Sequence, residues 1–312
     1  MKLSVVIPAH NEEANIRTSI DELLKIIAAI NSVNDFNIIV VDDHSDDDTY
    51  GVVTRIGNPR VWCIRLSRPS GSHTSLRAGI RESAGDAVLC ISADGQDNPS
   101  CLSEMLQKLE RGSNIVWALR TSRKDEQFFI RGPATLFYKL LFTVLNRRQD
   151  GIDLSGASFF IFDSAVAGAI NSCPERNTSL FGLIAWLGFK QDFVNFQKRE
   201  RLSGKSKWNL KSRFRLAKDW IIAFSGLPLK IASLTGIFIS MLGAIGALFI
   251  ILRKLFYGYA VMGWPSTAVL ILILGGIQLV MLGLIGEYLW QNLDESRKRP
   301  LYFIEKRSGS NL

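Results

Sequence analysis

The chain has 312 residues, of which 47% are hydrophobic, and this is enough for a core in one large or two ordinary domains. Its four cysteines are scattered without a paired spacing, which argues against a disulfide scaffold and against a zinc site. The net charge of +8 is concentrated beside two long apolar runs, which favours anionic lipid headgroups and phosphate ligands over nucleic acid as partners.

Three short β-rich runs in the first hundred residues each lead into a polar loop and then a segment compatible with a helix. The runs end before His10-Asn-Glu-Glu13, before Asp42-Asp-His-Ser-Asp-Asp-Asp-Thr49 and before Ser92-Ala-Asp-Gly-Gln-Asp-Asn-Pro99. Strands that alternate with helices predict an α/β fold with a mostly parallel sheet covered on both faces. Ligands bind such sheets beyond the carboxyl ends of the strands, so the three loops predict a binding site at one edge.

Two uncharged runs in the last third, Ile231–Leu252 and Ser266–Ile285, are 22 and 20 residues long. Each is long enough to span a bilayer as a helix, and a core helix that is apolar all round is unusual in a small protein. Lys and Arg crowd the outer flanks of the pair, so the positive-inside rule predicts that both termini are cytoplasmic. The first apolar run, ending at Pro8, does not have the form of a signal peptide, and we expect the first domain to stay inside the cell.

The segment before the first apolar run has the pattern of an amphipathic helix. Apolar residues recur at Leu210, Phe214, Ala217 and Ile221, with basic residues off that stripe. This predicts a helix in the membrane interface, with ordinary packing under the domain as the alternative. The expected organisation is a soluble α/β domain over 1–208, an interfacial region over 209–228, two transmembrane helices within 229–290 (about 231–252 and 266–289) and a cytoplasmic tail over 291–312.

The loops VVIPAHNEE, VVDDHSDDDT and ADGQDNP, in this order and spacing, resemble the nucleotide-sugar-binding loops of family 2 inverting glycosyltransferases with the GT-A fold. Later segments, from ERNTSLFGLIAWLGFKQ and RERLSGKSKWNLKSRFRLAKDWI to LGLIGEYL and RPLYFIEK, are similar to the polyprenyl-phosphate glycosyltransferases. That group contains the bactoprenol glucosyl transferases and dolichyl-phosphate mannose synthase. The resemblance covers almost the whole chain, including the apolar runs.

The resemblance implies transfer of a hexose, with inversion, from a nucleotide sugar to undecaprenyl or another polyprenyl phosphate. A UDP-sugar is the expected donor, and the reaction is expected at the cytoplasmic face of a bacterial plasma membrane. A flippase and a later transferase would then use the product, in the decoration of an envelope polysaccharide. The resemblance also implies a homo-oligomer, specifically a tetramer, and small residues in both apolar runs permit close helix contact within one hairpin or between copies.

The resemblance also assigns roles to individual residues. The nucleotide sugar would contact Pro8, Ala9, Asn11, Glu12, Asp43, Ala93 and Asp94. A divalent cation, Mg²⁺ or Mn²⁺, would be held by Asp94 and the carbonyl of Gln96, since these ions prefer oxygen ligands. The donor diphosphate or the lipid phosphate would meet Arg201, Lys205 and Lys207, and more weakly Arg120, Arg123 and Arg131, for which a surface role is the alternative.

This sequence departs from the family pattern at two positions. The usual Asp-x-Asp begins here with Ser92, so one ligand carboxylate is missing; Asp97 would replace it, or else it makes a turn or caps a helix. Ser158 stands where relatives carry a candidate catalytic Asp, and Asp153 is close enough in sequence to replace that acid. A lipid phosphate is already ionised near neutral pH and hardly needs a general base.

Two other functions remain open from the sequence alone. One is transfer to a glycerolipid hydroxyl, for which a general base would matter more. The other is a non-catalytic nucleotide-sugar-binding membrane subunit, suggested by Ser92 and Ser158. Which sugar is transferred depends on a few pocket contacts that the sequence does not fix. Of the three histidines, His10 and His44 are expected beside the nucleotide, and His73 is expected to be structural.

Overall fold

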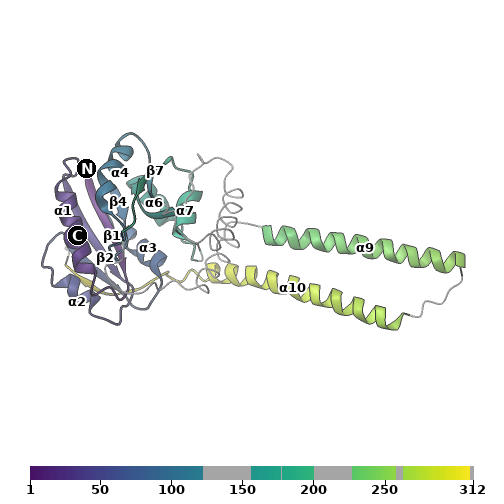
Figure 1. Ribbon diagram of the computed structural model, residues 1–312. Coiled ribbons are helices and arrows are strands. Elements are labelled where there is room, and N and C mark those ends of the chain that lie inside the picture. Colours follow the sequence, from purple (N-terminus) through teal and green to yellow (C-terminus); the bar gives the residue numbers. More distant parts are fainter. Residues whose placement is uncertain (122–155, 177, 200–226, 258–262, 310–312) are drawn as a thin grey trace. The chain divides into compact units, whose positions relative to one another are not determined.

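The computed structural model describes residues 1–121, 156–176, 178–199, 227–257 and 263–309 (Figure 1). The chain forms two compact units, one of Met1–Arg213 with Pro300–Leu312 and the other of Phe214–Arg299. The first unit thus takes in residues from Pro300 onward, which the sequence analysis placed in a separate tail. The predicted interfacial segment 209–228 lies outside the described residues except for its last two.

The first unit is built on one eight-stranded sheet in the order β7-β5-β6-β4-β1-β2-β3-β8. The strands are β1 Lys2–Ala9, β2 Asp35–Asp42, β3 Val61–Leu66, β4 Ala87–Cys90, β5 Ile115–Arg120, β6 Ala157–Asp163, β7 Gln191–Phe196 and β8 Ile304–Ser308. Four neighbouring pairs are parallel, and the pairs β4–β6, β5–β6 and β3–β8 are antiparallel. The predicted α/β fold with a mixed, mostly parallel sheet is confirmed.

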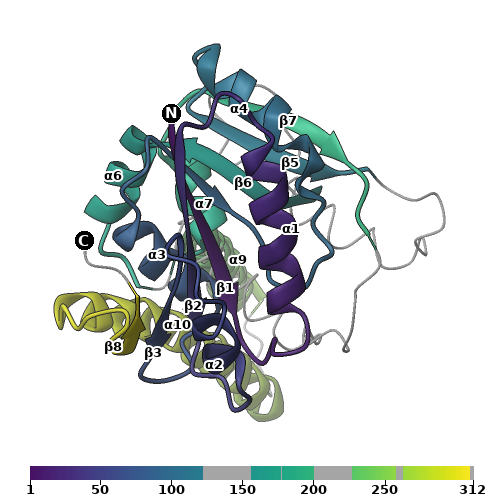
Figure 2. The ribbon, with the colours of Figure 1, turned by 90° about the vertical axis from the view of Figure 1, so that its left-hand side faces the viewer.

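Helices cover both faces of this sheet (Figure 2). They are α1 Ile16–Ala28, α2 Thr49–Thr54, α3 Ser72–Glu82, the 3-10 turn η1 Pro99–Cys101, α4 Leu102–Glu110, α6 Ser164–Ser172 and α7 Leu180–Trp186. The alternation of β1 decides which face each helix covers, because neighbouring strand residues point to opposite sides. Val5 and Ile7 share a core with α1, α2 and α4, whereas Val6 shares a core with α3, α6 and α7. Gly79 lets α3 approach closely, since a Cβ there would meet the side chain of Val6.

The second unit contains two long helices, α9 Leu227–Tyr257 and α10 Trp264–Ser296. Both are long and apolar enough to cross a membrane, over Ala232–Arg253 and Ile273–Ser296, and no part of either window is buried in the structure. The two helices touch where Met281 packs against Gly236. A Cβ at any of the other predicted small glycine positions would meet no atom within 4 Å: Gly243, Gly246, Gly275, Gly276, Gly283 and Gly286.

Candidate functional site

The three polar loops predicted from the sequence meet at one edge of the sheet, here called the loop edge. β1, β2, β4, β5 and β7 all run in one direction, so their carboxyl ends lie there together with the amino end of the antiparallel β6. This brings the loops after β1, β2 and β4 together and places Arg120 and Ser158 at the same edge. The predicted convergence of the loops is therefore confirmed.

The loops after β1 and β2 are tied together through Asn11. Its backbone N–H donates to the Ser45 hydroxyl at 2.9 Å, and its side-chain oxygen accepts from the Asp46 N–H at 2.8 Å. Asn11 and His44 both have positive φ, 55° and 57°, a conformation that costs a residue with a Cβ free energy and clusters at functional sites. These side-chain bonds hold both residues in that conformation.

Asp43 and Glu12, both predicted nucleotide contacts, are part of the same framework. The two oxygens of the buried Asp43 carboxylate accept from the backbone N–H groups of Ser70 and Gly71 at 2.7 and 2.8 Å. The N–H of Glu12 donates to the hydroxyl of Thr49 at 2.9 Å. Each carboxylate oxygen accepts two hydrogen bonds, so a nucleotide contact of Asp43 would add to these bonds.

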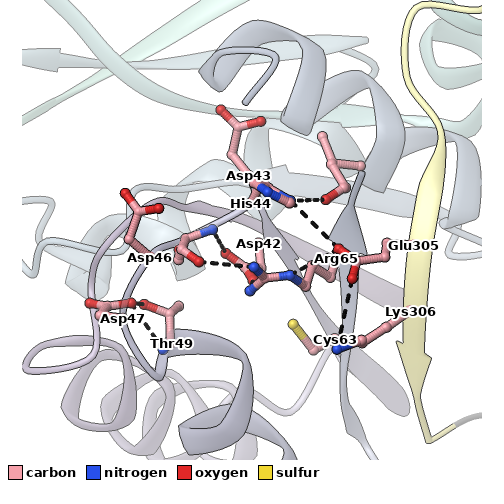
Figure 3. Close-up of polar contacts among 12 residues, drawn as sticks. Asp42, Asp43, His44, Asp46, Asp47, Thr49, Cys63, Arg65, Glu305 and Lys306 are labelled. Atoms are coloured by element: carbon pink, nitrogen blue, oxygen red, sulfur yellow. Dashed lines mark hydrogen bonds and ion pairs between the residues drawn. The ribbon is translucent and has the colours of Figure 1, made fainter. Parts of the chain in front are cut away.

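Beneath the β2 loop lies an ion-pair network that the sequence analysis did not anticipate (Figure 3). Asp42, 0% exposed, accepts from the Arg65 guanidinium at 2.8 Å through one oxygen and from the Ser45 N–H at 2.9 Å through the other. The guanidinium also donates to the Ser45 carbonyl at 2.9 Å and to Glu305 of β8 at 3.2 Å. Burial lowers the pKa of Arg65, but the charges of Asp42 and Glu305 outweigh it and raise that pKa, so the group stays charged.

At the loop after β4, the two serines that replace family acids meet on one carboxylate. Ser92 Oγ lies 2.6 Å from one oxygen of Asp97, and Ser158 Oγ donates to the other at 2.5 Å. Asp97 is 5% exposed. The cap alternative for Asp97 is wrong, because the side chain that caps η1 is Asn98, which accepts from the Ser100 N–H. Asp97 instead joins the loop to the start of β6.

Asp94, the predicted metal ligand, lies half-buried in the same loop. One of its oxygens is 2.9 Å from Ser92 Oγ and accepts from the Gln96 N–H at 3.1 Å. Within the described residues no three His, Cys, Asp or Glu side chains are grouped to hold a metal ion. Mg²⁺ needs only one or two carboxylates when phosphates and water complete its shell, so a single Asp94 carboxylate fits such an ion.

The chain that leaves β7 is fastened to the same loop by Arg199. Its backbone N–H donates to the Gln96 carbonyl at 3.0 Å, and its guanidinium donates to Asn98 at 2.8 Å and to Glu22 of α1 at 2.6 Å. The predicted second metal ligand, the Gln96 carbonyl, therefore already accepts one hydrogen bond, with a second lone pair remaining. Arg199 opens the basic segment, and nothing in the sequence marked it out from its basic neighbours.

The remaining predicted site residues divide into two groups. Pro8 and Ala9 end β1, Ala93 is buried with its carbonyl bonded to Ser19 Oγ at 2.9 Å, and Arg120 is exposed at the end of β5. Six lie outside the described residues: Arg123, Arg131, Asp153, Arg201, Lys205 and Lys207.

The histidines occupy the positions expected of them. His10 Nδ1 lies 3.0 Å from the Asp43 carbonyl, and His44 Nδ1 lies 3.1 Å from the Leu66 carbonyl, so both border the first two loops. His73 is structural, since its Nδ1 accepts from the Leu180 N–H at 3.3 Å and its ring packs edge-on against Phe181. Burial lowers the pKa of His73 to about 4, which keeps the ring neutral.

Comparison with known proteins identifies the family. Residues 4–166 match the family described as glycosyl transferase family 2. The chain belongs to this family. It is 37% identical over 311 residues to an uncharacterized glycosyltransferase of Synechocystis sp., covering 99% of this chain and 96% of the relative. It is 31% identical over 310 residues to the prophage bactoprenol glucosyl transferase homolog of Escherichia coli, covering 98% and 99%.

The fold of this glycosyltransferase is also found among solved structures. A mycobacterial protein of known crystal structure, 20% identical, aligns with 71% of this chain and 72% of its own at a TM-score of 0.50. The aligned share leaves out a part of the chain about the size of the two apolar helices. The family 2 activity and the GT-A fold that the resemblance implied are confirmed.

Proposed function

We propose that this glycosyltransferase moves a hexose from a nucleotide sugar, in the first instance a UDP-sugar, to a polyprenyl phosphate at the cytoplasmic face of a bacterial plasma membrane. The observation that carries the proposal is a match over 99% of a relative named as a bactoprenol glucosyl transferase homolog, including the two apolar helices. An acceptor with a long lipid tail requires an enzyme held at a membrane, and those helices supply the anchor.

The donor would lie against the loop edge. Asn11, Glu12 and Asp43 offer acceptors for a base and a ribose, beside Pro8 and Ala9 at the end of β1. Asp94, flanked by Ala93, would hold Mg²⁺ or Mn²⁺ with the carbonyl of Gln96. When bound, the cation supplies positive charge that offsets the charge developing on the departing nucleoside diphosphate.

The phosphates would be met by the basic segment that begins at Arg199. Arg199 is fixed on the loop after β4, so Arg201 starts within about 7 Å of it along the chain. From that position Arg201, Lys205 and Lys207 would reach the donor diphosphate or the lipid phosphate. Arg120 is exposed at the same edge, and Arg123 and Arg131 follow it in the sequence.

Attack by an acceptor phosphate oxygen on the anomeric carbon, in line with the leaving nucleoside diphosphate, inverts the configuration. The phosphate is already ionised near neutral pH, so the step needs no strong base. The hydroxyl of Ser158 is bonded to Asp97, which favours a positioning role for this serine over a role as base. Asp153 is the candidate if a base acts.

The membrane arrangement follows from the same proposal. Both termini would be cytoplasmic, and the product would pass to a flippase and a transferase that works outside. The glycines of α9 and α10 that face open space in one chain would allow copies to pack closely, in keeping with a homotetramer.

The test is radiolabel transfer by the full-length protein in membranes. A panel of UDP-, GDP- and other nucleotide sugars is offered with undecaprenyl phosphate or diacylglycerol, with Mg²⁺, Mn²⁺ or EDTA. We expect one UDP-hexose to label undecaprenyl phosphate in a metal-dependent way. Label in diacylglycerol instead would replace the proposed acceptor with a glycerolipid hydroxyl, and nucleotide-sugar binding without any transfer would overturn the proposal.

A further inference from the structure

The last strand of the sheet is supplied by the chain that follows the second apolar helix. α10 ends at Ser296, and Ile304–Ser308 forms β8, antiparallel to β3 at the edge of the sheet. Main-chain pairing alone would suffice to cover this edge. β8 also carries two ion pairs that leave it in different directions, through Glu305 and through Arg307.

Glu305 leads to the nucleotide loops through Arg65. Its carboxylate accepts from Arg65 Nε at 3.2 Å, and the other nitrogens of the same guanidinium hold Asp42 and the Ser45 carbonyl at 2.8 and 2.9 Å. Ser45 in turn accepts from Asn11, the residue that ties the two loops together. Four side chains thus connect β8 to the loop after β1 (Figure 3).

The geometry of arginine gives Glu305 influence over this chain of contacts. A guanidinium is rigid and planar, so fixing its Nε edge also fixes the directions of its two terminal nitrogens. The Arg65 side chain is 17% exposed and that of Asp42 is 0% exposed, so these bonds form largely out of water. His44 Nδ1 lies 3.5 Å from the same Glu305 carboxylate, which places a second loop residue beside it.

We propose that Glu305 is a positioning residue for the donor: through Arg65 it sets the conformation of the 42–46 loop and therefore the affinity for the nucleotide. The inference rests on the proposed function, since it takes these loops to bind the nucleotide of the donor. It assigns a role in substrate binding to a strand that lies beyond both apolar helices in the sequence.

Arg307 provides a matched control on the same strand. Its guanidinium binds both oxygens of Glu82, at the end of α3, at 2.8 and 2.9 Å. Residues two apart on a strand lie on the same face, so Glu305 and Arg307 both fasten β8 to the domain, but only Glu305 contacts Arg65. A variant of Arg307 weakens the attachment of β8 without touching the loop network.

The experiment compares wild type, Glu305→Ala, Glu305→Gln and Arg307→Ala as full-length protein in detergent. Binding of UDP in the presence of Mn²⁺ is measured by calorimetry, and hydrogen exchange is followed in peptides that cover residues 42–49. We expect Glu305→Ala to raise the Kd for UDP at least five-fold and to speed exchange in those peptides. Glu305→Gln keeps one acceptor for Arg65 and should have a smaller effect, and Arg307→Ala should stay within two-fold of wild type.

In turnover assays the same Glu305→Ala change should raise KM for the donor while kcat changes less than two-fold, because the loss is one of donor binding. Equal effects of Glu305→Ala and Arg307→Ala would reduce β8 to a structural support and overturn the inference, as would unchanged UDP affinity and unchanged exchange in Glu305→Ala. If wild-type protein does not bind UDP, the proposed uridine donor fails by itself. The exchange rates of residues 42–49 then still decide whether Glu305 positions the loop.

Discussion

At the β1–β2 side of the loop edge, the buried carboxylates of Asp42 and Asp43 face a guanidinium and backbone N–H groups, whereas at the β4–β6 side the buried carboxylate of Asp97 faces two serine hydroxyls. The first side is held by charge compensation from within the protein. The second is held by neutral donors around a single charge. The cation expected at the loop edge therefore belongs to the second side, where the protein supplies no compensating charge of its own to Asp97.

The serines at 92 and 158 explain how the second side is stable without a cation. Both hydroxyls lie within hydrogen-bonding distance of Asp97, and Ser92 also lies near Asp94. Acids at these two positions would set carboxylates against Asp97 at contact distance, and like charges so close disfavour ionisation. Serine turns this repulsion into hydrogen bonds, and one carboxylate, Asp94, is left to face a diphosphate-bound ion.

The largest effect that would break the comparison is expected from Asp94→Asn. If the second side depends on a cation, losing its one carboxylate ligand should lower the transfer rate about 100-fold or more at saturating donor. Asp46→Asn, an exposed acid of the first side, is the control and should stay within two-fold. Rates are measured against Mn²⁺ concentration, and full activity of Asp94→Asn at ordinary Mn²⁺ would remove Asp94 from the metal site.

A smaller effect separates the two modes of holding a carboxylate. Arg65→Met leaves Asp42 buried without its cation and should lower the free energy of unfolding by about 3–5 kcal/mol. Asp97→Asn should cost only about 1–3 kcal/mol, because serine hydroxyls can rotate to pair with an amide.

These two variants are compared by thermal unfolding of the full-length protein, read from the melting temperature. Ser92→Ala provides a third point, since it removes one neutral donor and leaves the Asp97 charge in place. A loss for Asp97→Asn as large as that for Arg65→Met would show that both sides depend on charge to the same degree.

The smallest effect concerns His73, which begins the helix that Asp43 holds and which contacts Leu180 of α7. Its folded pKa of about 4 is below the ordinary value near 6.5, so the unfolded state binds the proton more readily. Stability is therefore fully present above about pH 6.5 and is lost as pH falls toward 4, by up to about 3 kcal/mol.

His73→Asn keeps an acceptor for the Leu180 N–H but does not titrate, so its melting temperature should fall less than that of wild type between pH 6.5 and pH 4. Equal acid sensitivity of the two proteins would mean that His73 is not the titrating group.

The sequence was a good guide wherever local pattern and function coincide. Each loop follows an apolar run, and parallel strands bring such loops to one edge, so the convergence of Asn11, Asp43 and Asp94 could be predicted from the order of strands and loops along the chain. The choice of Asn98 over Asp97 as the cap of η1 was not predictable, because either side chain suits a cap and only the backbone geometry separates them.

β8 was missed for a different reason. Its residues, Ile304-Glu-Lys-Arg-Ser308, are mostly charged, as is common for edge strands, and show no apolar alternation. The contact between Arg65 and Glu305 joins residues 240 positions apart, and no local pattern in either segment points to the other.

The position of β8 also governs the order in which the protein is completed during synthesis. β3 is made early, but the strand that covers it comes after both apolar helices, 240 residues beyond Arg65. At about 5–20 residues per second, the β3 edge waits on the order of 10 to 50 seconds for its partner. In that interval the sheet presents an open edge, and Arg65 and Asp42 are paired without Glu305. The nucleotide loops therefore reach their final form only when the ribosome has already passed the membrane hairpin.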